Sequence, residues 1–89
     1  MVNRLYGIAP KRNPAVRWRQ EEDKVLLAQS MALNEMGAFI WALCDGQHVF
    51  EQIITEICQR YEVESEEVVR RDVSDFLLDL YSNNLILLK

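Results

Sequence analysis

Residues 31–46, with the sequence MALNEMGAFIWALCDG, decide the fold because a short apolar run leads directly into a helix. Met31-Ala32-Leu33 has the length of a short strand, and Asn34 is a typical helix N-cap, since its side chain can accept from a free amide of the first turn. Asp45-Gly46 ends the helix, because glycine accepts the left-handed backbone that a helix terminus often needs. Between them, apolar residues recur at spacings of three and four and form one helical stripe: Met36, Phe39, Ile40 and Leu43.

Two further strands are expected upstream of this segment. Val16-Arg17-Trp18-Arg19 alternates apolar and charged residues and contains β-branched and aromatic side chains, as strands do. Val25-Leu26-Leu27 is a second apolar run, and the polar residues 20–23 between the two runs are typical of a hairpin turn. Three short strands joined locally predict a small antiparallel sheet.

Two further helices are expected downstream. The second helix runs from about Val49 to Tyr61, and the third begins at Ser65, where Glu66 and Glu67 follow the cap. Their buried stripes are Phe50, Ile53, Ile54, Ile57 and Tyr61 in the second helix, and Val69, Val73, Phe76, Leu77 and Leu80 in the third. Asn83-Asn84 ends the third helix, and the apolar run after it is short enough to be a final strand or a tail. The predicted fold class is α+β: a winged-helix-like unit with a small three-stranded antiparallel sheet followed by a three-helix bundle.

The length of 89 residues corresponds to one domain. Residues 1–13 contain a proline and scattered basic groups and are expected to be an irregular lead-in, so the single domain is assigned to residues 14–89. With 49% hydrophobic and 27% charged residues, the chain is neither a disordered tail nor a membrane protein. Charged residues interrupt the N-terminus, which therefore lacks an apolar signal core, and a cytoplasmic location is expected.

The net charge of −4 conceals an uneven distribution. Residues 1–30 carry six basic and three acidic groups, whereas residues 31–89 carry four basic and eleven acidic groups. A winged-helix DNA-binding domain of a small regulator is the alternative function, but its third helix should offer Arg, Lys, Asn or Gln to base edges. Here Asp72, Asp75 and Asp79 form an acidic stripe that a phosphate backbone would repel. No nucleic-acid partner is therefore expected.

Residue types that carry catalysis are sparse. His48 is the only histidine, Cys44 and Cys58 lack metal-ligand spacing, and the three glycines form no phosphate-binding loop. His48 is expected to be a surface residue near a helix start, and the cysteines are expected to be buried reduced thiols. We therefore expect neither an enzyme nor a metal site.

Peptide binding fits the pattern better. Met31-Ala32-Leu33 is expected to be an edge strand, and an exposed edge offers backbone donors and acceptors that an extended peptide can complete. On the outer face of the third helix, Arg71, Asp75 and Leu78 follow one another at spacings of four and three. Leu78 is either part of a docking surface or an ordinary exposed leucine, and Arg71 and Asp75 are either part of that surface or an i,i+4 ion pair.

Several runs together resemble the PqqD family, which is named for the peptide chaperone of pyrroloquinoline quinone biosynthesis. They are Val25-Leu26-Leu27, Met31-Ala32-Leu33-Asn34-Glu35 and Ile40-Trp41-Ala42-Leu43-Cys44-Asp45-Gly46, continued by Ile53 to Ile57, Tyr61, Asp72-Val73 to Leu80 and Leu85-Ile86. The resemblance covers residues 14–86. The link between Leu27 and Met31 is shorter than in the quinone-pathway members, and Asn83-Asn84-Leu85 stands where those tend to have Gly-Trp. The pathway is therefore either that of pyrroloquinoline quinone or that of another modified peptide.

The resemblance implies a non-catalytic recognition element for ribosomally made precursor peptides. Such a domain binds the leader of the precursor as an added strand between its third strand and third helix. It then presents the peptide to a radical S-adenosylmethionine enzyme that carries iron–sulfur clusters. The cofactors would belong to that partner enzyme, so no cofactor is expected in this chain. The expected peptide-binding residues are Met31, Ala32, Leu33, Val68, Arg71, Asp75 and Leu78.

Overall fold

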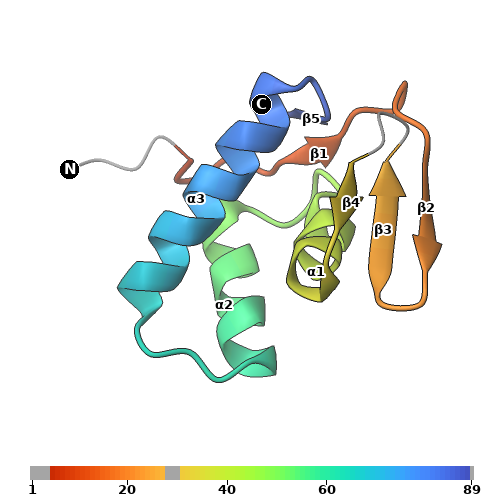
Figure 1. Ribbon diagram of the computed structural model, residues 1–89. Helices are drawn as coiled ribbons and strands as arrows, with labels where there is room; N and C mark the ends of the chain where they lie inside the picture. Colours follow the sequence, from red (N-terminus) through yellow and green to blue (C-terminus); the bar gives the residue numbers. More distant parts are fainter. Residues whose placement is uncertain (1–4, 28–30, 89) are drawn as a thin grey trace.

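A three-stranded sheet, three helices and a separate two-stranded sheet make up the part of the protein that the structure describes (Figure 1). The computed structural model describes residues 5–27 and 31–88. The strands are β1 (Lys11–Arg12), β2 (Trp18–Glu21), β3 (Lys24–Leu27), β4 (Ala32–Leu33) and β5 (Ile86–Leu87), and the helices are α1 (Glu35–Leu43), α2 (Phe50–Arg60) and α3 (Glu66–Ser82). The predicted α+β class and the order of sheet and helices are confirmed.

The larger sheet has the strand order β2-β3-β4 and is antiparallel throughout. A tight turn joins β2 to β3, and Glu22 in that turn has a positive φ of 57°. The turn predicted at residues 20–23 began two residues too early, because Gln20 and Glu21 still pair with β3. Met31 precedes β4, and its carbonyl accepts from the amide of Leu27 at 2.8 Å, so the expected third strand is confirmed at the edge of the sheet.

Side-chain caps begin two of the helices as predicted. Oδ1 of Asn34 accepts from the amide of Gly37 at 2.9 Å, and Oγ of Ser65 accepts from the amides of Glu67 and Val68. These bonds satisfy amides that the first turn of a helix leaves without an internal partner. Gly46, which follows α1, has a φ of +78°, as expected from its role in ending that helix.

Residues 5–13 correct the expectation of an irregular lead-in that lies outside the domain. Leu5 is only 1% exposed, and β1 pairs with β5 through Lys11↔Leu87 and Arg12↔Ile86. This pairing joins opposite ends of the chain, so no local sequence pattern predicts it. Residues 1–4 of the expected lead-in lie outside the described residues.

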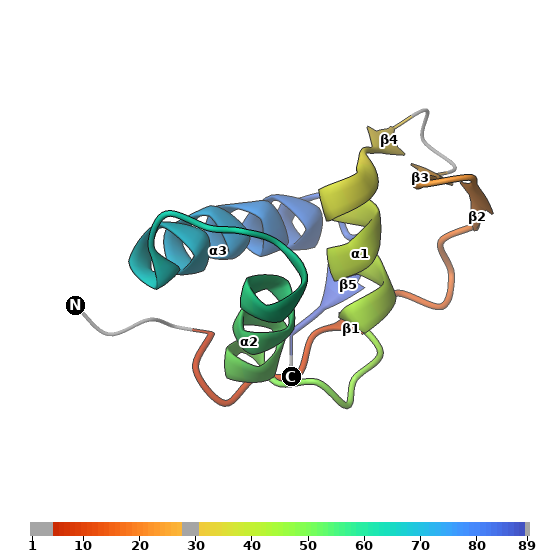
Figure 2. The same ribbon diagram turned by 90° about the horizontal axis from the view of Figure 1, so that it is seen from below.

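The core lies around α1, which packs between the three-stranded sheet and the helix pair α2–α3 (Figure 2). Trp41 and Phe50 are fully buried in it. Trp18 on β2 is 41% exposed and meets Trp41 edge to face, with 5.8 Å between the ring centroids. The described helices include none that combines the length and the apolar character required to cross a bilayer.

Candidate functional site

The outer edge of β4 is open in the described part of the chain, because the strand order ends there. The amide of Leu27 donates to the carbonyl of Met31, and Val25 and Leu26 lie opposite Leu33 and Ala32. Hydrogen-bonded and non-hydrogen-bonded pairs alternate along an antiparallel ladder, so Ala32 belongs to a non-hydrogen-bonded pair. Its N–H and C=O therefore point away from β3. An edge with such unpaired groups can accept another strand.

A groove of about 390 Å³ lies beside this edge, between β4 and α3. The first half of α1 lines its floor, and Ile57 of α2 and Val63 of the following loop also line it. The lining residues are Ala32, Leu33, Asn34, Met36, Gly37, Ile40, Ile57, Val63, Val69, Asp72, Val73 and Phe76. Most of them are apolar, so the groove offers a surface on which apolar side chains of a ligand can be buried.

Gly37 sets how closely the walls of the groove approach its floor. A Cβ added to Gly37 would lie 3.2 Å from Cβ of Leu33 and 3.3 Å from Cζ of Phe76. Both distances are shorter than the optimum of about 3.5–4.0 Å between carbon atoms. The missing side chain at this position therefore lets Leu33 of β4 and Phe76 of α3 both pack against the start of α1.

Asp72 is the charged residue among the described residues that line the groove. Its Oδ1 lies 3.9 Å from Nε of Arg71, and both side chains are about 70% exposed, at 69% and 71% respectively. An ion pair that is this long and this exposed contributes little. The carboxylate of Asp72 is thus available at the rim of an otherwise apolar groove.

The expected peptide-binding residues fall into two groups. Ala32 and Leu33 line the groove, and Met31 is half-buried against the core directly before β4. The four expected residues of α3 are exposed, at least in part, and do not line it: Val68, Arg71, Asp75 and Leu78. Leu78 is 40% exposed and Val68 37%, so neither is enclosed in the core. Their contacts with a peptide stay a prediction.

The α3 wall of the groove consists instead of Val69, Asp72, Val73 and Phe76. Successive residues of a helix are separated by about 100°, so Arg71 lies about a quarter turn away from Asp72. The spacing of the apolar residues does predict that Val69, Val73 and Phe76 share a face. It does not show that part of this face borders a groove, because a buried and a half-open stripe have the same period.

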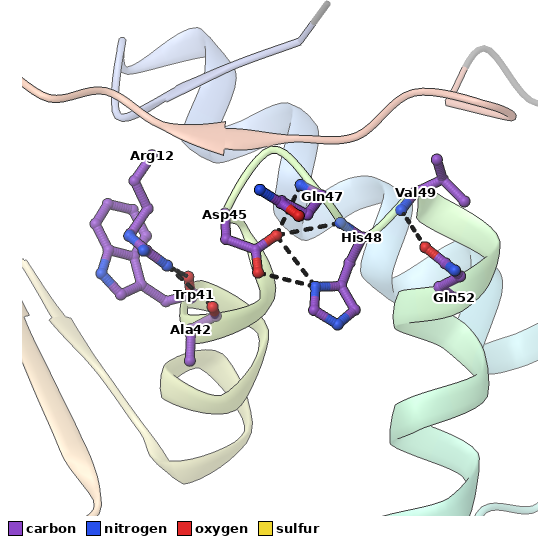
Figure 3. Close-up of polar contacts among 8 residues, drawn as sticks. All are labelled: Arg12, Trp41, Ala42, Asp45, Gln47, His48, Val49 and Gln52. Atoms are coloured by element: carbon purple, nitrogen blue, oxygen red, sulfur yellow. Dashed lines mark hydrogen bonds and ion pairs between the residues drawn. The ribbon is translucent and has the colours of Figure 1, made fainter.

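The loop between α1 and α2 is a second place where titratable residues meet (Figure 3). The carboxylate of Asp45 accepts from the amides of Gln47 and His48 at 2.8 and 3.1 Å, and Nδ1 of His48 lies 3.0 Å from it. Partial burial works to raise the pKa of Asp45, but the hydrogen bonds from His48 and Gln47 outweigh it and lower the pKa. These contacts hold the loop in its turn.

Among the described residues, neither a metal-binding cluster nor a reactive thiol lies beside this loop. Within residues 5–27 and 31–88, no three His, Cys, Asp or Glu side chains are grouped so that they could hold a metal ion. Cys44 is buried, and this burial raises the pKa of its thiol to about 12, so the nucleophilic thiolate is scarce at neutral pH. Next to this loop, the guanidinium of Arg12 donates hydrogen bonds to the carbonyls of Trp41 and Ala42 at the end of α1 (Figure 3).

The fold and the groove define a small winged-helix-like binding module with an open sheet edge. The family model described as coenzyme PQQ synthesis protein D (PqqD) matches residues 23–86. The chain therefore belongs to the PqqD family, as its resemblance indicated.

Among solved structures, the chain is similar to TbiB1 in complex with the TbiA(beta) leader peptide, with 31% sequence identity and a TM-score of 0.76. The match covers 85% of this chain and 93% of that one. The comparison with curated proteins gave no match.

Proposed function

We propose that this domain binds the leader of a ribosomally made precursor peptide as an additional strand on β4. The observation that carries the proposal is the register of β4, which directs the N–H and C=O of Ala32 away from the sheet at the wall of an apolar groove. A peptide strand on this edge would complete both groups. The similarity to TbiB1, which was solved with a leader peptide, supports the same role.

Backbone pairing and groove burial would contribute to binding in different ways. Hydrogen bonds to β4 require only that the peptide is extended, so they give affinity without reading its sequence. Alternate side chains of an added strand point to opposite faces, so every second side chain can enter the groove. The apolar lining then favours leaders whose inward-facing residues are apolar, and this sets the sequence preference.

The proposed contacts on β4 are Met31, Ala32 and Leu33. On α3 the proposed contacts are Val68, Arg71, Asp75 and Leu78, together with the residues that form the wall itself. Because these four α3 residues lie outside the groove lining, they would touch a peptide only through side chains that extend over the rim. Substitutions in the groove lining should therefore weaken binding more than substitutions of these four.

We further propose that the domain presents its bound peptide to a separate modifying enzyme, a radical S-adenosylmethionine enzyme with its own iron–sulfur clusters, in the cytoplasm. Holding the leader raises the local concentration of the segment that reacts, and effective concentrations reach about millimolar for short flexible connections. The pathway is that of pyrroloquinoline quinone or of another modified peptide. Modification of the full precursor should then slow when this domain is left out, whereas a precursor without its leader should respond little.

A display library of random twelve-residue peptides tests the binding site itself. Peptides selected on the folded protein are added to a ¹⁵N-labelled sample, and amide shifts are followed by NMR. We expect the largest shifts in β4 and in residues 68–79 of α3. Shifts confined to residues 11–20 would show that the groove is not the binding site.

A further inference from the structure

We propose that Asp72 makes the groove select leader segments that carry a lysine or arginine two positions from an apolar anchor residue. This inference rests on the proposed function and names the class of peptide that the same site takes. Asp72 is a charged residue in the otherwise apolar wall that α3 forms in the groove beside the open edge of β4.

The carboxylate of Asp72 has no strong partner among the described residues. Its pair with Arg71 is long and exposed. The other basic residue on this part of α3, Arg70, is engaged elsewhere, since it donates to Glu66 at 3.0 Å and to the hydroxyl of Tyr6 at 2.7 Å. Nothing strong within the described chain therefore competes with a cation that arrives on the peptide.

A peptide in the groove would cover part of this carboxylate and remove water from it. Covering a charge without supplying a partner is unfavourable, whereas a charge-assisted hydrogen bond is among the stronger polar contacts. A basic peptide residue supplies that bond, a neutral residue leaves the carboxylate poorly solvated, and an acidic residue adds repulsion. Asp75 lies three positions further along α3 and is exposed, so it adds to the negative charge near Asp72.

The spacing along the wall fits an extended peptide. Asp72 and Phe76 are one helical turn apart, which corresponds to about 6 Å along the axis of α3. Residues i and i+2 of a strand share a face and are separated by about 6.6 Å. A leader that seats an apolar side chain beside Phe76 can therefore bring its second neighbour on the same face to Asp72.

The display library distinguishes this inference from the proposed function. Selections are run in parallel on the wild-type protein, on Asp72→Asn, which keeps the size of the side chain, and on Asp79→Asn, which removes an exposed acid of α3 outside the groove lining. Wild type and Asp79→Asn should enrich peptides with Lys or Arg two positions from an apolar residue. Asp72→Asn should enrich the apolar residue alone.

One selected peptide is then compared with its Lys→Gln or Arg→Gln version. The change should weaken binding to wild type by about three- to tenfold, and binding to Asp72→Asn by less than twofold. Groove-binding peptides without a basic preference, or a preference that persists in Asp72→Asn, would overturn the role of Asp72 and leave the proposed function standing. A failure to select any peptide that shifts the groove amides would overturn both.

Discussion

Replacing Ala32 by proline removes an N–H from the open edge of β4 while leaving the sheet intact. Ala32 is exposed, and its N–H points away from β3 because it lies opposite Leu26 in a non-hydrogen-bonded pair. Edge strands tolerate proline at positions where the N–H faces outward. We therefore expect the free energy of unfolding to change by less than about 1 kcal/mol.

The effect of Ala32→Pro on peptide binding should be much larger. The lost hydrogen bond is worth about 0.5–1.5 kcal/mol. The proline ring also occupies the space where a peptide carbonyl would otherwise lie about 2.9 Å from the amide nitrogen. Displacing that carbonyl disturbs the neighbouring bond of the ladder, so the total loss is about 1–3 kcal/mol. This corresponds to a Kd that is roughly five- to 150-fold higher.

Gln20→Pro is the matched control on the opposite edge of the sheet. Gln20 lies opposite Val25, which exchanges its hydrogen bonds with Leu33 on β4, so the N–H of Gln20 also points away from the sheet. Fluorescence anisotropy with a labelled, groove-selected peptide gives the affinities, and thermal unfolding verifies that both variants are folded. The reasoning is refuted if folded Ala32→Pro binds as tightly as wild type, or if Gln20→Pro weakens binding to the same extent.

Three further substitutions test separate parts of the structure. Leu5→Ala should lower the free energy of unfolding, measured in urea, by about 2–4 kcal/mol, because Leu5 is only 1% exposed. A loss below about 0.5 kcal/mol would show that residues 5–13 do not complete the core. Alanine usually stabilises a helix by about 1 kcal/mol relative to glycine, but Gly37→Ala should not stabilise this protein, because the new Cβ would crowd Leu33 and Phe76. A rise in thermal stability that corresponds to the full gain of about 1 kcal/mol would contradict this packing. Asp45→Asn should cost about 0.5–1 kcal/mol at pH 7. The pKa of Asp45 is lowered from 3.8 in the folded protein, so its contribution is present above 3.8 and is lost as the pH falls through the lower folded pKa. A difference in stability between Asp45→Asn and wild type that does not narrow as the pH is lowered below 3.8 would exclude this contribution.

The starts of the helices are predictable from the sequence because they depend on neighbouring residues. Asn34 and Ser65 each lie within three residues of the amides that they cap, and an apolar stripe follows each of them. The two-stranded sheet is different. Its strands have two residues each and pair Lys11 with Leu87, so neither alternation nor proximity in the chain indicates them.

The binding surface is predictable only in part, for a related reason. The edge position of β4 follows from a short strand that leads into a helix, and the structure has Ala32 and Leu33 at the groove. The α3 wall depends on how far that helix is rotated and on the close approach over Gly37. The spacing of the apolar residues predicts that Val73 and Phe76 lie on the same face of α3. Which edge of this face stays open depends on how α3 packs against α1.

Hydrogen exchange at two adjacent amides tests the added strand most directly. The amide of Ala32 has no partner within the sheet, whereas the amide of Leu33 already bonds to Val25. When a groove-selected peptide is added to saturation, NMR should show exchange at Ala32 slowing by at least about tenfold, with a much smaller change at Leu33. An unchanged exchange rate at Ala32 in the saturated complex would contradict strand addition on β4.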